Sequence, residues 1–248
     1  CTNTAIVTVT VNSIPSIVVN SGTICEGQSF TITPSGANTY TYSSGSSIVS
    51  PMQSSTYSVS GTSSAGCVSS SPVISTVNVL SSPTLVVSGG TVCSGQSFTL
   101  SPSGALNYTY SGGNSVVSPT TNTTYTITGT NANGCVNYIP AIATITVNAL
   151  PTVSASSGSI CSGNSFTINP TGALSYTYSS GSNVVTPLTT TTYSLFGSNA
   201  AGCSNTLAAI VTVTVNSIPA ITVNSGTICE GQSFTITPSG ANTYTYSS

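Results

Sequence analysis

Five residue types are missing from this chain of 248 residues. It has no lysine, arginine, histidine, aspartate or tryptophan, and its only acidic side chains are Glu26 and Glu230. Without histidine, aspartate and lysine the chain cannot build a Ser-His-Asp triad, a Cys-His pair, a Schiff base or a Ser-Lys dyad. We therefore expect no enzymatic activity, no catalytic residue and no cofactor.

The near-absence of charge also excludes several kinds of partner. Binding to nucleic acid requires lysine or arginine to neutralise phosphates, so we expect no nucleic-acid partner. Calcium requires several carboxylates close together, so we expect no metal site. Glu26 and Glu230 occupy the same place in a repeat, and serine stands there in other repeats, so we interpret them as solvated surface residues. No apolar run approaches the ~20 residues of a membrane-spanning helix.

The residues that are present favour β-structure. Valine, isoleucine and threonine are abundant, and these residues fit the half-buried surface of a sheet. Apolar and hydroxyl residues alternate, as in residues 28–33, where Phe30 and Ile32 share one face. This period of two is typical of strands with one buried face. Disordered chains are usually rich in charge and poor in β-branched residues, and this chain is the reverse, so it is predicted to fold.

The sequence repeats with a period of about 68 residues, which indicates tandem structural units. Cys25, Cys93, Cys161 and Cys229 are spaced evenly by this period, and so are Cys67, Cys135 and Cys203. We therefore predict three whole immunoglobulin-like repeats and parts of two others. Residues 1–14 would be the final strand of a preceding repeat, 15–82, 83–150 and 151–218 the whole repeats, and 219–248 the first half of a following repeat. Residues 6–44 match residues 210–248 at all but two positions, so we expect a longer array built of three-repeat units.

The cysteines indicate disulfides formed in an oxidising compartment. Because each whole repeat holds two cysteines, we predict the pairs Cys25–Cys67, Cys93–Cys135 and Cys161–Cys203, with Cys1 and Cys229 paired to residues beyond this segment. Each bridge would close a loop of about 43 residues and stabilise a small repeat by roughly 4 kcal/mol. Two alternatives are metal-binding cysteines and a head-to-tail pairing of the chain ends. Neither the spacing of the cysteines nor the residues present at the ends favours them.

Each repeat is predicted to contain about seven short strands. Six of them can be located: in the first repeat residues 17–19, 28–33, 39–42, 47–50 and 56–60, and a last strand that is clearest as residues 141–147 of the second repeat and 210–215 of the third. Short strands with turn signals every 8–12 residues and one bridge are typical of an immunoglobulin-like β-sandwich. The fold class is therefore all-β, with tandem sandwiches of about 68 residues and one disulfide each. Short proline-containing junctions favour a rod-like arrangement.

Tyrosine pairs recur in every repeat. They are Tyr40 and Tyr42, Tyr108 and Tyr110, and Tyr176 and Tyr178. One interpretation is an aromatic surface that stacks on sugars. The other is packing against the core, because tyrosine buries a large ring while its hydroxyl group finds a polar partner. We favour packing and retain the aromatic surface as the alternative.

Several motifs resemble those of a known class of proteins. Gly22-Thr23-Ile24-Cys25-Glu26-Gly27-Gln28-Ser29-Phe30 and Asn133-Gly134-Cys135, with their counterparts in the other repeats, are similar to tandem immunoglobulin-like repeats of large secreted Bacteroidota surface adhesins. Those proteins are associated with gliding motility and the type IX secretion route. The resemblance covers the whole chain. It implies a stalk or adhesive filament outside the cell and carries over no catalytic residue. The absence of lysine and arginine departs from it.

Four functions compete at this stage. The first is an extracellular structural segment, a stalk or filament at the cell surface whose uncharged Ser/Thr faces associate laterally with other copies of the protein. The second is a module that binds extracellular polysaccharide or glycans. The third is ice binding, which a twisted sandwich serves poorly. The fourth is a spacer in a secreted enzyme. Among these, the sequence favours the structural role.

Overall fold

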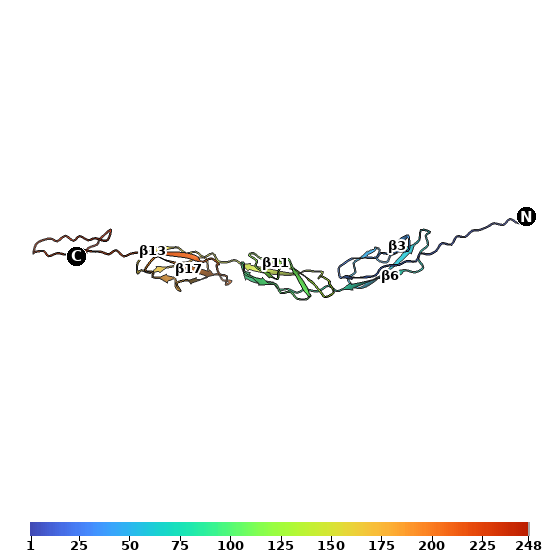
Figure 1. Ribbon diagram of the computed structural model, residues 1–248, viewed down its shortest axis with the longest axis horizontal. Coiled ribbons are helices and arrows are strands. Elements are labelled where there is room, and N and C mark those ends of the chain that lie inside the picture. Colours follow the sequence, from blue (N-terminus) through green and yellow to red (C-terminus); the bar gives the residue numbers. More distant parts are fainter. Residues whose placement is uncertain (248) are drawn as a thin grey trace. The chain divides into compact units, whose positions relative to one another are not determined.

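The structure is a computed structural model that describes residues 1–247. Across these residues it contains strands and no helix, and it divides into two compact units, Cys1–Val147 and Asn148–Ser248. The first unit contains two sets of six strands and the second contains one. Figure 1 shows the strands of each repeat gathered into a separate group, with β3 and β6 in the first, β11 in the second, and β13 and β17 in the third.

Each set of six strands falls within one of the predicted whole repeats. In the first repeat the strands are β1 (Gly22–Cys25), β2 (Phe30–Thr31), β3 (Thr39–Tyr42), β4 (Ile48–Val49), β5 (Ser55–Thr62) and β6 (Val73–Leu80). In the second they are β7 (Gly90–Cys93), β8 (Phe98–Thr99), β9 (Asn107–Tyr110), β10 (Val116–Val117), β11 (Thr123–Thr130) and β12 (Ala141–Asn148). In the third they are β13 (Gly158–Cys161), β14 (Phe166–Thr167), β15 (Ser175–Tyr178), β16 (Val184–Val185), β17 (Thr191–Ser198) and β18 (Ala209–Asn216).

The strands of one repeat form a two-sheet sandwich. In the first repeat the larger sheet has the order β1-β6-β5-β3, and the smaller sheet pairs β2 with β4. β1 runs parallel to β6, while the β6–β5 and β5–β3 pairs are antiparallel. The predicted strand 17–19 is reduced to an isolated bridge between Val18 and Ser35, so each repeat has six strands where about seven were predicted. This strand order confirms the immunoglobulin-like sandwich predicted from the sequence.

Alternating side chains from both sheets fill the core. In β5, Val59 is fully buried and lies between outward-facing Ser58 and Ser60. Ile32 and Val49 reach the same core from the side of the smaller sheet. Burying one such aliphatic side chain contributes roughly 1.5–3 kcal/mol. The other two repeats have equivalent clusters around Ile127 and Leu195.

Two differences from the predicted strands matter for the site. The stretch Gly22–Cys25 was not predicted as a strand, yet it forms β1 and runs parallel to β6. The predicted strands 28–33 and 47–50 shorten to β2 and β4, while the predicted last strand is confirmed as β12 and β18. Residues 1–16 contain no strand. Residues 219–247 contain only the bridge between Thr222 and Ser239. The assignment of both segments to neighbouring repeats stays a prediction.

Candidate structural site at the junction of two repeats

The first cysteine of a repeat lies at the end of β1. Cys25 is paired with Leu80, the last residue of the parallel strand β6, and the Glu26 backbone N–H donates to the Leu80 carbonyl at 3.0 Å. Beyond Cys25 the chain turns sharply at Gly27, which has a φ of +80°. The Gln28 side-chain oxygen accepts a hydrogen bond from the Cys25 backbone N–H at 3.1 Å. Cys25 is thus fixed where its repeat ends and the next begins.

The second cysteine lies on a hairpin tip between the two longest strands. In the second repeat this tip joins β11 to β12, and the Asn131 side-chain oxygen accepts hydrogen bonds from the backbone N–H groups of Asn133 and Cys135, both at 3.0 Å. Gly134 has a φ of +80°, which glycine adopts without steric cost. The tip is therefore a rigid loop that presents Cys135, and the structure buries this cysteine completely.

A disulfide joins the two elements. Cys25 and Cys135 are bonded, with their Cα atoms 5.5 Å apart and 110 residues between them in sequence. Cys25 belongs to the first repeat and Cys135 to the second, so the bridge crosses the junction. We call this bridge the staple. It links two repeats that are also joined through the backbone at residues 81–83.

The predicted pairing of the cysteines within each repeat is therefore wrong. Cys25 is bonded to Cys135, so neither Cys25–Cys67 nor Cys93–Cys135 forms. Cys67 is free, and Cys161 is free while Cys203 is disulfide-bonded, which excludes Cys161–Cys203 as well.

The direction of the strands explains the error. Cys25 lies opposite Leu80 at one end of β6, whereas Cys67 precedes Val73 at the other end. An eight-residue strand spans about 27 Å. A disulfide requires Cα atoms within about 7 Å. The two cysteines of one repeat therefore lie at opposite ends of the sandwich and cannot meet.

The remaining cysteines fall into two groups. Cys93 and Cys203 are both disulfide-bonded. Cys1, Cys67, Cys161 and Cys229 are free. The prediction that Cys1 and Cys229 pair with residues beyond this segment stays a prediction.

Polar contacts surround the staple. The Asn131 side-chain amide donates to the Ser81 carbonyl at 2.9 Å, which ties the hairpin tip of the second repeat to the junction. The Ser82 backbone N–H donates to the Glu26 carboxylate at 3.3 Å. Glu26 is half-buried. It thus differs from the predicted solvated surface residue, because its carboxylate satisfies a backbone donor of the junction.

An aromatic ring completes the contact between the two repeats. The Tyr138 ring lies so close to Gly27 that a Cβ atom at residue 27 would be 2.5 Å from Tyr138 Cδ2. Tyr138 is 62% exposed, so its ring rests against Gly27 from the solvent side, and glycine readily adopts the positive φ of this turn. One junction thus combines a disulfide, two hydrogen bonds and an aromatic ring in contact with the turn.

The tyrosine pairs pack against the cores. Tyr40, Tyr42, Tyr108, Tyr110, Tyr176 and Tyr178 are half-buried and contact the hydrophobic clusters of their repeats. The Tyr108 hydroxyl donates to the Ala105 carbonyl at 2.9 Å and accepts from the Ala105 backbone N–H at 3.1 Å. Tyr40 and Tyr176 make the same pair of bonds to Ala37 and Ala173. Nothing in this arrangement supports a sugar-stacking role for these rings.

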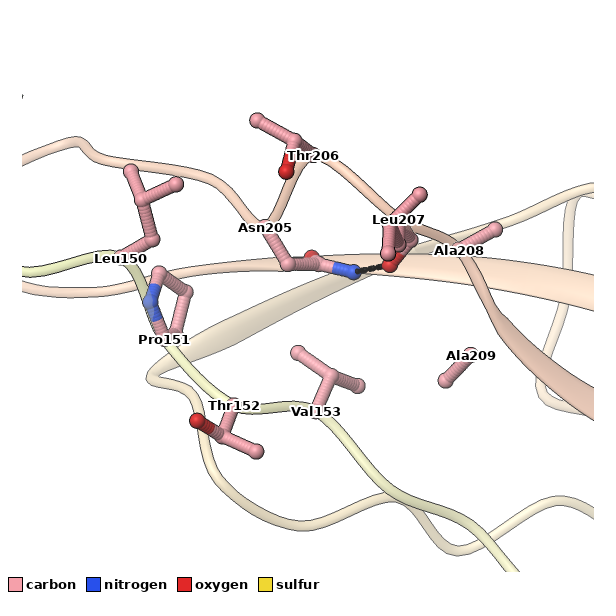
Figure 2. A pocket seen from close by; sticks show the side chains of 9 residues that line it. All are labelled: Leu150, Pro151, Thr152, Val153, Asn205, Thr206, Leu207, Ala208 and Ala209. Carbon is pink, nitrogen blue, oxygen red and sulfur yellow. Dashed lines mark hydrogen bonds between the residues drawn. The ribbon is translucent and has the colours of Figure 1, made fainter. Parts of the chain in front are cut away.

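Shallow cavities occur at equivalent places in two repeats. One of about 380 Å³ lies between residues 150–153 and the loop 205–209 (Figure 2), where the Asn205 side-chain amide donates to the Leu207 carbonyl. A second of about 370 Å³ is lined by residues 82–85 and 138–141, with Glu26 at its edge. The first is lined by aliphatic, proline, threonine and asparagine side chains. It therefore holds no group that could act as an acid, a base or a charged anchor.

Other kinds of site are equally unsupported by the part of the chain that the structure describes. Residues 1–247 hold no group of three or more histidine, cysteine or acidic side chains that could bind a metal ion. Within the same residues, no helix is long and apolar enough to cross a membrane.

Comparisons with known proteins find weak structural likenesses. No protein-family model matches the chain, and no curated protein matches it in sequence. Among solved structures, the I-band fragment I67–I69 from titin is 9% identical, with a TM-score of 0.32, over 82% of this chain and 98% of that one. A Ca2+-stabilized adhesin that helps an Antarctic bacterium reach out and bind ice is 14% identical, with a TM-score of 0.31, over 86% and 77%.

A third structure covers the chain more widely. The N-terminal eight Ig domains of Down Syndrome Cell Adhesion Molecule are 12% identical, with a TM-score of 0.28, over 88% of this chain and 44% of that one. This chain thus spans less than half the length of that structure. The immunoglobulin-like fold of the repeats rests on their own strand order and register, and the junction is understood from its own contacts.

Proposed function

We propose that this chain is a structural, non-enzymatic segment of an extracellular stalk or filament, belonging to a bacterial surface adhesin or fibre. The observation that carries the proposal is the Cys25–Cys135 staple, because it joins consecutive repeats instead of stabilising each repeat alone. Such bridges form and persist in oxidising, extracellular surroundings. The missing charged residues support a structural role further, since they remove the groups that catalysis and charged ligands require.

The resemblance of the motifs to secreted Bacteroidota adhesins motivates the bacterial surface as the location. The test is antibody labelling of intact cells that express the protein, with gold particles viewed by electron microscopy. We expect label spaced regularly along threads outside the cell. A thread about 20–25 Å wide would be one sandwich thick, since paired sheets lie ~10 Å apart and carry side chains on both outer faces. Label found only inside cells would overturn the proposal.

A second candidate function is lateral association of the repeats into a thicker fibre. The outer face of the larger sheet carries hydroxyl groups and no charge. In the second repeat Thr124 and Thr126 are exposed on β11, and the Thr124 and Thr144 hydroxyls lie 3.5 Å apart across the β11–β12 pair. Ile142 is 63% exposed on the same sheet. Uncharged faces with exposed apolar groups favour association between copies.

A charge placed on this face is therefore expected to reduce bundling. Thr126→Lys puts a cation in the middle of the face, where two copies would have to bury it or repel each other. We expect several-fold less assembly in light scattering at neutral pH and low salt, and partial recovery in high salt. The control is Asn114→Lys, which adds the same charge on an exposed turn away from this face. Equal effects of the two variants would contradict face-to-face association.

A further inference from the structure

The staple changes which residues would carry a pulling force. Cys25 and Cys135 are 110 residues apart along the backbone, while their Cα atoms are 5.5 Å apart through the bridge. When the chain is pulled from a point before Cys25 and a point after Cys135, the tension passes through the disulfide, because that covalent route is the shorter one. Residues 26–134 are then bypassed, and these include β2–β6 of the first repeat and β7–β11 of the second.

The lengths of the two routes differ strongly. Residues 13 and 149 lie two repeat periods apart along the backbone. Through the staple the route uses only residues 13–25 and 135–149, which is 26 residue steps. At ~3.5 Å per extended residue this route reaches about 95 Å with the bridge included, whereas the whole backbone would reach about 480 Å.

The fully extended covalent route through the staple is only slightly longer than the same two repeats when folded. The longest strands have eight residues and span about 27 Å each, so two sandwiches with their turns and junction span about 70 Å. Tension can therefore lengthen this stretch by only about 25 Å before the covalent route is taut. Unravelling a whole repeat would require far more slack than the staple leaves.

The spacing of the cysteines allows the same device at each junction of an array. The rule is that the first cysteine of one repeat bonds the second cysteine of the next, 110 residues further on, as Cys25 and Cys135 do. With one such bridge for every two repeats, the covalent route would gain 26 residue steps for every two repeats.

We propose that the staple makes the stretch between residues 13 and 149 an inextensible, tension-bearing tether whose repeats do not unfold under load. The proposal deepens the proposed function, since it assigns the stalk or filament a mechanical task. It differs from ordinary tandem domains with internal bridges, in which each domain can still unfold. Had Cys25–Cys67 and Cys93–Cys135 formed instead, the interval from 13 to 149 would contain 52 residue steps and reach about 190 Å.

Single-molecule pulling between residues 13 and 149 tests the proposal. Ser13 and Ala149 are exposed, so each can be replaced by an azide-bearing residue that accepts a handle in the full chain. Without reductant we expect the interval to stop lengthening at about 95 Å, with no unfolding step. With reductant we expect unfolding steps and a final length of about 480 Å, roughly five times longer. An oxidised interval that reaches about 190 Å or more would overturn the proposal.

Two cysteine variants make the result specific. Cys135→Ser removes the staple, so we expect the long extension even without reductant. Cys67→Ser alters a free cysteine and should leave the limit at about 95 Å. A longer limit in Cys67→Ser would show pairing within the repeat and would contradict the tether. The labelling experiment decides the extracellular location independently, so a failed tether and a failed location are distinguishable.

Discussion

Trypsin will cut a Ser70→Lys variant once, and the two pieces will stay together until a reductant is added. The chain has no lysine or arginine, so the new lysine is the single tryptic site. Ser70 is exposed and lies between Cys67 and Cys93, in the loop that leads into β6. The Cys25–Cys135 staple spans the cut, whereas neither Cys25–Cys67 nor Cys93–Cys135 would. Denaturing gel electrophoresis should show one band without reductant, and with it two fragments that correspond to positions 1–70 and 71–248.

The control places the same site outside the staple. In Ser217→Lys the cut falls beyond Cys203 at an exposed residue, so residues 218–248 should separate without reductant. Adding Cys135→Ser to Ser70→Lys should also release the two pieces without reductant. Separation of the Ser70→Lys pieces on a non-reducing gel would show that the cysteines pair within repeats. We expect an all-or-none result on the gel, because a disulfide either joins the two pieces across the cut or does not.

Loss of the staple is also expected to lower the stability of the paired repeats. In the chain-entropy model a bridge that closes a loop of about 110 residues stabilises the folded state by roughly 5 kcal/mol. A single sandwich of roughly 70 residues buries a small core and is marginal alone. The staple therefore serves folding as well as load-bearing.

The sequence alone was sufficient to predict the repeats, the all-β class and most of the strands. Alternation such as that around Phe30 and Ile32 identifies a buried face, and the recurring glycines and prolines mark the turns. The tyrosines were interpreted as packing residues for a general reason, namely that a ring with one polar end suits a half-buried position. Their half-buried places against the cores are consistent with that reasoning.

The disulfide pairing could not be derived from the spacing of the cysteines. The two cysteines of one repeat are always the same number of residues apart, and so are the cysteines on either side of a junction. Pairing within repeats and pairing across junctions therefore fit the spacing equally well. The decisive feature is that Gly22–Cys25 forms a strand parallel to β6. A strand of four residues containing glycine and ending at a cysteine gives too little alternation to be identified. Without this strand, the sequence does not show that the two cysteines of one repeat lie at opposite ends of the sandwich.

The role of Glu26 was missed for a similar reason. A serine stands at its position in other repeats, which favoured a solvated surface residue. Its hydrogen bond to the Ser82 backbone depends on how the turn after β1 meets the junction, and this is a tertiary contact between residues 56 positions apart. Tyr138 and Asn131 contact the junction over similar or longer separations. Contacts of this kind leave no local pattern in the sequence.

Gly104→Ala is expected to destabilise the second repeat far more than Gly113→Ala. Both glycines have positive φ, +102° and +81°, and a left-handed conformation costs a residue with a Cβ atom roughly 1–2 kcal/mol. At Gly113 an added Cβ meets nothing within 4 Å, so only this strain applies. At Gly104 the Cβ would collide with the Thr84 carbonyl oxygen, and the two segments would have to separate.

That separation would break a specific pair of hydrogen bonds. Val86 and Ser103 exchange backbone hydrogen bonds of 3.1 and 2.9 Å, which hold the first stretch of the repeat against the sandwich. Each contributes about 1 kcal/mol, and the strain at residue 104 adds to the loss. We expect Gly104→Ala to cost about 3 kcal/mol or more, and Gly113→Ala about 1–2 kcal/mol.

Urea unfolding followed by circular dichroism measures both effects against the unmodified chain. The same close approach recurs at Gly36 and Gly172, where a Cβ would collide with the Ser16 and Thr152 carbonyl oxygens. A matching loss in each repeat would show that every sandwich depends on this contact between its first stretch and the turn after its second strand. Equal midpoints for Gly104→Ala and Gly113→Ala would instead show that the first stretch can move away without cost. Loss of this contact would loosen the stretch that connects one repeat to the next, and the staple with the hydrogen bonds at the junction would then hold the two repeats together.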